Sequence, residues 1–415
     1  MFGVGFGQIS WRRRDMSEDI GVFELTPQKE IYSRINKLQE KMGEEEVELT
    51  LLIQNVDLFY FSGTIQKGFL FIPLGEKPVF FVQKNYERAT MESPLRCIKT
   101  QGIKTLPNLL REFGLKGKRV GMELDVVPVS LFYKIKDLFR EWEIMDISEQ
   151  IKEVRSVKSE FEITQIKKSG KIIDKVFSEA KYYLKEGMSE LELDAILNSI
   201  GRTNGHQGFL RMRGFNQEMP NIYVLSGDDA CMTSFCDAPI SGYGATPAIA
   251  QGSSARRIER DRPIIIDYGG GYNGYITDET RVFVIGRLKR QLERAYRTAL
   301  NIVEDMESFA KEGVLAVQIY ERAKEIAAKE GLAPYFMGYG EEKVSFVGHG
   351  LGLEINEWPI IGRGFNRPLQ AGMVFAFEPK FIFPGEGAVG IEMDYIVSKG
   401  GVERVTQFPG EIISL

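Results

Sequence analysis

The sequence predicts an α/β protein, of the α+β kind, built from a small N-terminal α/β domain and a larger C-terminal domain. The chain has 415 residues, which is long for a single hydrophobic core. Short apolar and β-branched runs alternate with longer segments of helical periodicity, as expected for strands and helices that pack in layers. A strong helix start at Ser159 marks the border. We therefore expect a leader over residues 1–27, a first domain over 28–154 and a second over 155–415.

The N-terminal domain shows both kinds of periodicity in short segments. Its elements are expected to be a helix at 31–42, strands at 49–53, 69–73, 79–82 and 119–122, and a helix at 129–142. The second and third strands flank a turn containing Gly75 and read as a hairpin-like meander. No convincing catalytic group of residues lies in this domain.

Two capping boxes open the C-terminal domain. Ser159 with Glu162 starts a helix that extends to about residue 184, and Ser189 with Glu192 starts another that extends to about residue 202. The later elements are expected to be strands at 222–225, 263–266, 275–285, 374–377 and 390–397, and helices at 288–312 and 316–331.

Composition excludes several classes of partner. The content of 43% apolar and 27% charged residues is that of an ordinary globular protein, and the net charge of −5 with no basic field argues against nucleic acid or an anionic membrane. No run approaches the roughly 20 apolar residues that span a bilayer. The three scattered cysteines favour free thiols in a reducing compartment, so we expect a cytoplasmic protein. The leader places apolar residues before Arg12, the reverse of a secretory signal, and Met16 is a plausible start.

The segment from 262 to 286 predicts a β-hairpin that carries two acids. Strand 263–266 delivers Asp267 at its end, a Gly-rich turn follows, and strand 275–285 carries Asp278 near its start. Burying two carboxylates in an apolar sheet is costly unless a cation neutralises them, and a metal is the simplest explanation. The glycines at 269, 271 and 274 match a dinucleotide fingerprint only superficially, because a strand follows where that fingerprint requires a helix. We expect them to close the hairpin.

Three further residues complete a ligand set. His349 stands between glycines, Glu378 follows strand 374–377, and Glu392 lies within strand 390–397. Together with Asp267 and Asp278 they make five ligands, of which four are carboxylates. Four negative charges exceed the charge of one divalent ion, so two ions are expected. Oxygen-rich ligation with one imidazole suits Mn, Fe, Co or Zn.

The order of these motifs resembles a known family. Asp267, then Asp278 in GYITDETR, then GHGLGL, FEPK and IEMD, is similar to the pita-bread metallohydrolases: prolidase, aminopeptidase P, methionine aminopeptidase and creatinase. The stretch QNVDLFYFSG at 54–63 resembles their creatinase/prolidase N-terminal module, and RSVKSEFEI resembles their linker. The resemblance spans about residues 28–415 and implies a pita-bread catalytic domain in which helices back a curved antiparallel sheet. Relatives of this kind also imply a homodimer.

The resemblance implies a role for each ligand. Asp267 would bind one ion, Asp278 and Glu392 would bridge both, and His349 and Glu378 would bind the other. Glu378 would also be the general base toward a water that both ions share and whose pKa they lower to about 7.

Two departures from the family concern the substrate. Family peptidases carry a second histidine seven residues after the ligand histidine, where this chain has Asn356 followed by Glu357. They also carry a histidine before the first aspartate strand, and residues 247–251 contain none. Two roles remain open for each of three residues near the expected site. Asn356 could donate a hydrogen bond to the substrate or be purely structural, and Glu357 could contact the substrate or orient its neighbours. His206 could contact the substrate or be an ordinary loop residue.

Three functions remain open from the sequence. The first is a dinuclear metallopeptidase that cleaves Xaa-Pro bonds in short peptides. The second is a creatinase-like hydrolase of a non-peptide small molecule, which would explain the replaced histidines. The third is a binding protein that keeps the fold without turnover.

Overall fold

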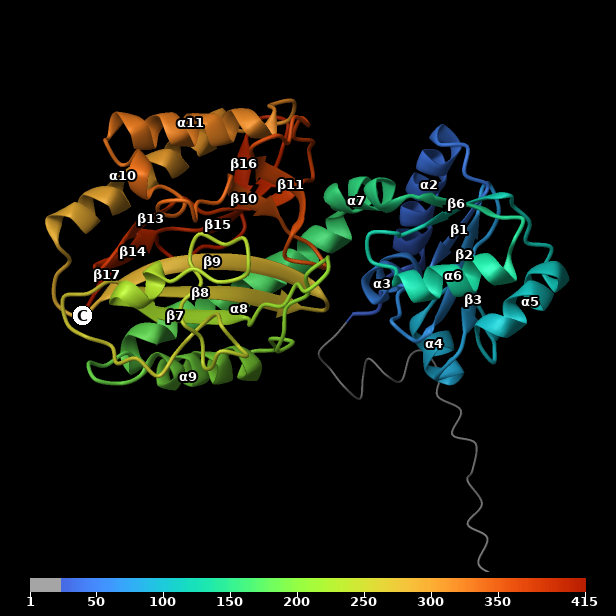
Figure 1. The fold of residues 1–415 in the computed structure, drawn as a ribbon, viewed down its shortest axis with the longest axis horizontal. Coiled ribbons are helices and arrows are strands. Elements are labelled where there is room, and N and C mark those ends of the chain that lie inside the picture. The colour runs from blue at the N-terminus through green and yellow to red at the C-terminus, as the bar shows by residue number, and fades with distance from the viewer. Residues whose placement is uncertain (1–23) are drawn as a thin grey trace, which may run out of the picture. The chain divides into compact units, whose positions relative to one another are not determined.

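The computed structural model describes residues 24–415, which form two compact units (Figure 1). The division falls between Val154 and Arg155. The predicted leader lies almost entirely outside the described residues, and helix α2 begins at Gln28. None of the helices formed by residues 24–415 has the length and apolar character needed to cross a membrane.

A six-stranded mixed sheet forms the centre of the N-terminal unit. The strand order is β4-β3-β2-β1-β5-β6, in which β2 is antiparallel to its neighbours β1 and β3 and all other neighbouring strands are parallel. The strands are β1 (Leu49–Leu52), β2 (Gly68–Pro73), β3 (Val79–Val82), β4 (Arg96–Lys99), β5 (Arg119–Met122) and β6 (Glu143–Asp146). The predicted antiparallel pairing of 69–73 with 79–82 is confirmed.

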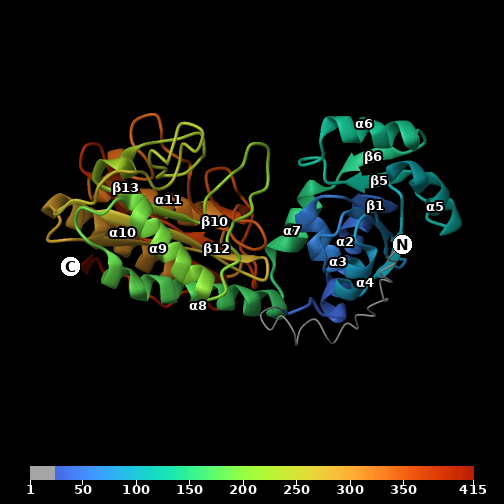
Figure 2. The same cartoon turned by 90° about the horizontal axis from the view of Figure 1, so that it is seen from below.

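Helices cover both faces of this sheet (Figure 2). They are α2 (Gln28–Glu44), α3 (Asn55–Ser62), α4 (Tyr86–Glu92), α5 (Leu106–Glu112) and α6 (Val129–Leu138), followed by α7 (Ser148–Ser156). Alternate strand residues such as Leu49 and Leu51 pack with Leu106 of α5 and Ile135 of α6 into one apolar cluster. Because the sheet is covered on both sides, its inner strands are apolar at almost every position.

Several elements of this unit were not predicted from the sequence, and two differences have a local cause. The stretch after β1 forms helix α3, whose first amides bond to the Gln54 side chain. The helix expected over 129–142 ends at Leu138, because Phe139 and Trp142 stack with ring centres 3.8 Å apart and the chain then continues as strand β6.

The C-terminal unit contains two larger sheets and a hairpin (Figure 1). One sheet has the order β17-β9-β8-β7, with β7 (Ile222–Ser226), β8 (Ile264–Tyr272), β9 (Tyr275–Val284) and β17 (Ile413–Ser414). The other has the order β11-β10-β12-β15-β16, with β10 (Phe346–Gly350), β11 (Glu357–Gly362), β12 (Val374–Phe377), β15 (Met393–Val397) and β16 (Val402–Arg404). The hairpin pairs β13 (Lys380–Phe383) with β14 (Gly387–Gly390).

Two pairs of helices pack on these sheets. Helices α8 (Glu160–Tyr183) and α9 (Glu190–Thr203) begin at the two predicted capping boxes and share an apolar cluster with β7, β8 and β9. Helices α10 (Arg290–Phe309) and α11 (Ala316–Lys329) share a second cluster with β10 to β15. Figure 1 shows α8 and α9 on one side of the strands and α10 and α11 on the other.

The β8–β9 hairpin is confirmed, but its turn lies later than expected. Asp267 is inside β8 and not at its end, because the glycines that follow continue the strand and pair with residues 276–278. Among the glycines of this stretch, only Gly274 has a positive φ (+89°), and it forms the tight turn together with Asn273 (φ +50°). A Cβ on Gly269 would lie 2.4 Å from Leu210, so this glycine lets the 205–219 segment pack directly on the strand.

The strand expected over 390–397 is interrupted. β14 ends at Gly390, β15 begins at Met393, and Glu392 lies between them. The backbone amide of Glu392 bonds to the carbonyl of Thr280 in β9 at 3.2 Å, so the chain crosses here from the hairpin to the other sheet. This crossing brings the Glu392 carboxylate to the two acids of the β8–β9 hairpin.

Candidate metal centre

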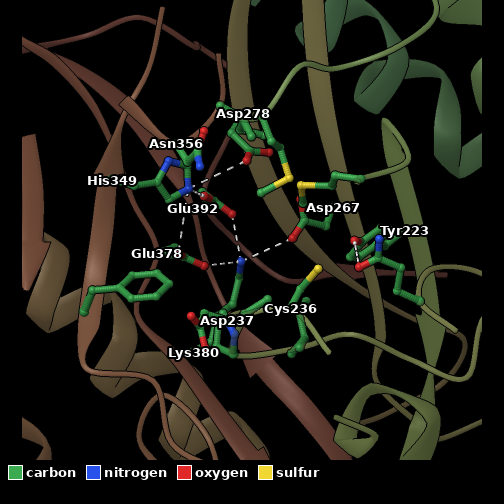
Figure 3. A pocket seen from close by; sticks show the side chains of 18 of the residues that line it. Tyr223, Cys236, Asp237, Asp267, Asp278, His349, Asn356, Glu378, Lys380 and Glu392 are labelled. Carbon is green, nitrogen blue, oxygen red and sulfur yellow. Dashed lines mark hydrogen bonds and ion pairs between the residues drawn. The ribbon is translucent and has the colours of Figure 1, made fainter. Parts of the chain in front are cut away.

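The five predicted ligands line one cavity of about 330 Å³ in the C-terminal unit. Figure 3 shows their side chains pointing toward one another from several elements. The wall is otherwise mainly apolar, with some polar groups: Met212, Gln217, Met219, Tyr223, Cys236, Asp237, Ala238, Pro239, Ile240, Gln251, Phe346, Ile355, Asn356, Glu357, Ile360 and Lys380.

The hairpin presents Asp267, Asp278 and Thr280 on one face. Asp267 is paired with Thr280 and Asp278 with Gly269 across the ladder, and side chains two residues apart share a face of a strand. Thr280 donates a 2.7 Å hydrogen bond to Glu392 Oε2. The pairing of β8 with β9 therefore fixes the positions of both aspartates relative to Glu392.

His349 in β10 faces three of the acids. Its Nε2 lies 3.9 Å from Asp278 Oδ2, 3.8 Å from Glu378 Oε1 and 3.8 Å from Glu392 Oε1. Ligand atoms from Asp278, His349 and Glu392 lie within 4.8 Å of one another. Since Zn²⁺ and similar ions bind such atoms at about 2.0–2.2 Å, donors this close can share one ion after small adjustments.

One atom of this group is notable for lacking a partner. Glu392 Oε1 is buried and accepts no hydrogen bond from any residue in the part of the chain that the structure describes. A buried carboxylate oxygen without a donor is costly unless an ion or water satisfies it. The donor set and this oxygen together fit a divalent ion.

Lys380 of β13 is the sixth ionisable residue of the cluster, and it is only 1% exposed. Its Nζ lies 2.8 Å from Glu378 Oε2, 2.8 Å from Glu392 Oε2 and 3.2 Å from Asp267 Oδ2 (Figure 3). Burial alone would lower the pKa of Lys380, but the three carboxylates raise it well above its usual value. Its ammonium group therefore stays charged at neutral pH.

Three aspartates of the cluster have raised pKa values. Burial raises the pKa of Asp278 well above its usual range, and Glu392 and Asp267 raise it further by repulsion. Burial also raises the pKa of Asp267, against the lowering effect of Lys380. Asp394 Oδ2 accepts a 2.9 Å bond from the Asp278 amide, and burial raises the pKa of Asp394 as well. Such a concentration of shifted carboxyl groups is typical of a functional site.

Asn356 and Glu357 line the cavity but have partners elsewhere. The Asn356 side chain accepts from the Arg213 amide and donates to the Arg213 carbonyl, both at 2.8 Å. Glu357 binds Arg155 at 2.6 Å and Lys158 at 3.1 Å. The first residue thus anchors the 205–219 segment, and the second is held in a buried ion cluster.

His206 does not line the cavity. Its Nε2 lies 2.9 Å from the Gly269 carbonyl and its Nδ1 accepts from the Gly208 amide at 2.9 Å. Its ring also lies edge-on to Tyr268. The structure therefore places this histidine as a buried link between the 205–219 segment and β8, apart from the other candidate substrate residues.

Three residues of the site were not identified from the sequence, although a sequence feature could have indicated each of them. They are Lys380, Thr280 and Asp394. Thr280 follows Asp278 by two residues and Asp394 follows Glu392 by two, a spacing that puts strand residues on one face. Lys380 opens the apolar run KFIF two residues after Glu378, where a solvated lysine would be out of place.

The cluster of buried carboxylates and one partly exposed imidazole has a donor set that suits a divalent metal, and the chain can be compared with known proteins on this basis. Metallopeptidase family M24 matches residues 164–399, and the creatinase/prolidase N-terminal domain matches residues 34–157. The chain belongs to metallopeptidase family M24. The predicted family, α/β fold and class of metal-dependent hydrolase are thereby confirmed.

Individual relatives extend over nearly the whole chain. An Xaa-Pro dipeptidase of Pyrococcus furiosus is 28% identical, covering 92% of this chain and 99% of its own. The crystal structure of the prolidase from Pyrococcus horikoshii matches with a TM-score of 0.78 and 26% identity, covering 92% of this chain and 100% of the other. An X-Pro aminopeptidase structure from Thermotoga maritima matches with a TM-score of 0.77 and 25% identity, covering 92% and 99%.

Proposed function

We propose that the protein is a divalent-metal-dependent peptidase that cleaves Xaa-Pro bonds in short peptides. The observation that carries the proposal is the convergence of Asp267, Asp278, His349, Glu378 and Glu392 in one cavity of an M24 chain. The names of its relatives, Xaa-Pro dipeptidase, prolidase and X-Pro aminopeptidase, support the substrate class.

In this proposal the carboxylates and His349 would hold the metal, which would supply Lewis-acid chemistry at neutral pH. Glu378 is placed to move the proton. Its buried carboxylate lies between His349 Nε2 at 3.8 Å and Lys380 Nζ at 2.8 Å, so both of its oxygens face the cluster. A carboxylate in this position accepts the proton of the attacking water and returns it to the leaving nitrogen.

The cavity wall suits a small apolar group beside a polar backbone. Met212, Ile240, Phe346 and Ile355 form an apolar surface next to the carboxylate cluster. A proline ring buries well against such side chains. Gln251, whose side chain donates to the Glu218 carbonyl and accepts from Tyr223, is the polar residue that the 247–251 segment contributes in place of a histidine.

A second candidate is the creatinase-like hydrolysis of a non-peptide small molecule. The observation that favours it is the position of Asn356, which uses its amide to bind the backbone of Arg213 where family peptidases present a histidine to the substrate. Loss of such a proton donor typically costs about 10²- to 10⁴-fold in rate.

A cleavage panel separates these functions. Chain reconstituted separately with Mn, Co, Fe or Zn is offered Xaa-Pro dipeptides, longer peptides with proline in the second position and guanidino or amide small molecules. We expect Xaa-Pro hydrolysis that is lost in Asp278→Asn and retained in the matched surface variant Asp137→Asn. Turnover of the small molecules alone would replace the first candidate by the second, and bound metal without any turnover would leave a binding protein.

We also propose a cytoplasmic homodimer, with Mn as the first metal to test. Three unpaired cysteines support a reducing compartment, and the resemblance to dimeric relatives supports the assembly. Light scattering of the purified protein tests the dimer, which a monomer mass would refute.

A further inference from the structure

We propose that the Lys380 ammonium group takes the place of one of the two ions, so that this centre holds a single divalent metal. The inference rests on the metal dependence of the proposed function and not on its peptide substrate. The resemblance to the family assigns the five ligands to two ions, and the geometry around Lys380 disagrees with that assignment.

The contacts of Lys380 coincide with those expected of a bound cation. Its Nζ is within 3.2 Å of oxygens from Asp267, Glu378 and Glu392. The Asp267 carboxylate also forms a hydrogen bond with Thr280, and its Oδ2 is the oxygen that lies 3.2 Å from Lys380 Nζ. The oxygens that a metal at this position would use are therefore already bound to an ammonium group.

The fold holds the lysine stem firmly in this position. Lys380 is paired with Gly390 across the β13–β14 hairpin, and a Cβ on Gly390 would lie 2.6 Å from Lys380 Cα and Cγ. The Met337 amide bonds to the Lys380 carbonyl at 2.9 Å on the other side. A glycine opposite the lysine therefore leaves the room that its side chain needs to reach the acids.

The other half of the cluster remains suited to a metal. Asp278, His349 and Glu392 Oε1 form the compact donor group, and Lys380 is bonded to the opposite oxygen of Glu392, Oε2. Within residues 24–415, Glu392 Oε1 is buried and accepts no hydrogen bond, so this oxygen is available to bind an ion. Glu392 would thus bridge a lysine and a metal.

A second ion bound to Asp267 would lie close to the Lys380 ammonium group. The Lys380 Nζ is 3.2 Å from Asp267 Oδ2 and 2.8 Å from oxygens of Glu378 and Glu392. Two cations close together in a buried site repel each other, so a single ion is the stoichiometry that avoids crowding cations against Lys380.

The test is the metal stoichiometry of the full chain, measured without a substrate. Metal-stripped protein is titrated with Mn²⁺ by calorimetry, freed of excess metal and analysed for Mn content, and its EPR spectrum is recorded. We expect about one Mn²⁺ per chain and the spectrum of an isolated ion in the wild type, rising to about two with the signature of a coupled pair in Lys380→Met. Lys399→Ala, at an exposed lysine of the same unit, should behave as the wild type.

Two further variants keep the test decisive if Lys380→Met fails to fold, as judged by circular dichroism. Asp267→Asn should leave the single ion bound, because Asp267 contacts Lys380, whereas Asp278→Asn should lose it. Two ions of similar affinity in the wild type, loss of the ion in Asp267→Asn, or a folded Lys380→Met that still binds one ion would each overturn the inference.

These results are independent of the peptide assay. One bound ion without Xaa-Pro cleavage would refute the proposed substrate and leave the inference standing. Cleavage with two bound ions would do the reverse, and a chain that binds no Mn²⁺ at any tested concentration would refute both.

Discussion

Replacing Glu357 by glutamine should destabilise the C-terminal unit strongly, although the side chains are nearly identical in shape. Glu357 accepts from Arg155 and Lys158 and from the amides of Leu353 and Glu354, at 2.6–3.1 Å. Burial raises the pKa of Glu357, but Arg155 and Lys158 more than offset this and lower it to about 2 from its usual 4.5. A difference of about 2.5 units at 1.36 kcal/mol each gives roughly 3 kcal/mol. Glutamine keeps one acceptor oxygen but leaves the two buried cations without this counter-charge.

The same shift fixes the pH dependence of this stabilisation. A carboxyl group whose pKa is lower in the folded state stabilises the fold above its unfolded pKa and loses that contribution as pH falls. The contribution of Glu357 should therefore be full at neutral pH, fall to about 1 kcal/mol at pH 3 and vanish near pH 2. Glutamine does not titrate, so the stability difference between wild type and variant should shrink along the same curve.

Urea unfolding followed by circular dichroism, on metal-stripped protein between pH 3 and 7, measures both quantities. Glu341→Gln, at an exposed position of the same unit, is the matched control and should stay within about 0.5 kcal/mol of the wild type. A Glu357→Gln variant as stable as this control at pH 7 would refute the reasoning, as would a difference that does not change with pH.

Three further outcomes are expected. Burial and the neighbouring Asp57 raise the pKa of Glu123 to about 7. The free energy of unfolding of the wild-type N-terminal unit should therefore fall by roughly 3 kcal/mol as pH rises from 4.5 to 7. In urea unfolding at several pH values, Glu123→Gln should reduce this pH dependence, and the exposed Glu141→Gln should not. Thr280→Val removes the 2.7 Å bond to Glu392 and should weaken Mn²⁺ binding about 10-fold by calorimetry, whereas unchanged affinity would show that Glu392 is positioned without it. Metal removal by a chelator should lower the melting temperature of the wild type, and an equal drop in Asp278→Asn would contradict the assignment of this ligand.

Local signals predicted the helices and the ligand-bearing segments well. The capping boxes at Ser159 and Ser189 placed two helix starts correctly, since the side chain and amide that satisfy each other are three residues apart in the chain. The order of four acids and one motif histidine predicted which residues lie in the cavity, and their convergence is observed. Their role as ligands stays a prediction.

Features that depend on distant packing were not predictable in the same way. The glycines after Asp267 looked like a turn, but they extend β8, and the 205–219 segment packs where side chains at Gly269 and Gly271 would be. Glu392 looked like a strand residue, but its amide bonds across to β9. His206 looked accessible in a Gly- and Arg-rich loop, and its ring bonds to β8 instead.

Because Gly390 leaves room for the Lys380 side chain, the carboxylate cluster has a counter-ion that is part of the polypeptide itself. This side chain cannot diffuse away from the cluster, cannot be removed by a chelator and does not depend on the supply of metal in the surroundings. The chain can consequently bring its acids together during folding before it has met any ion, and acquire the metal afterwards as a finished scaffold.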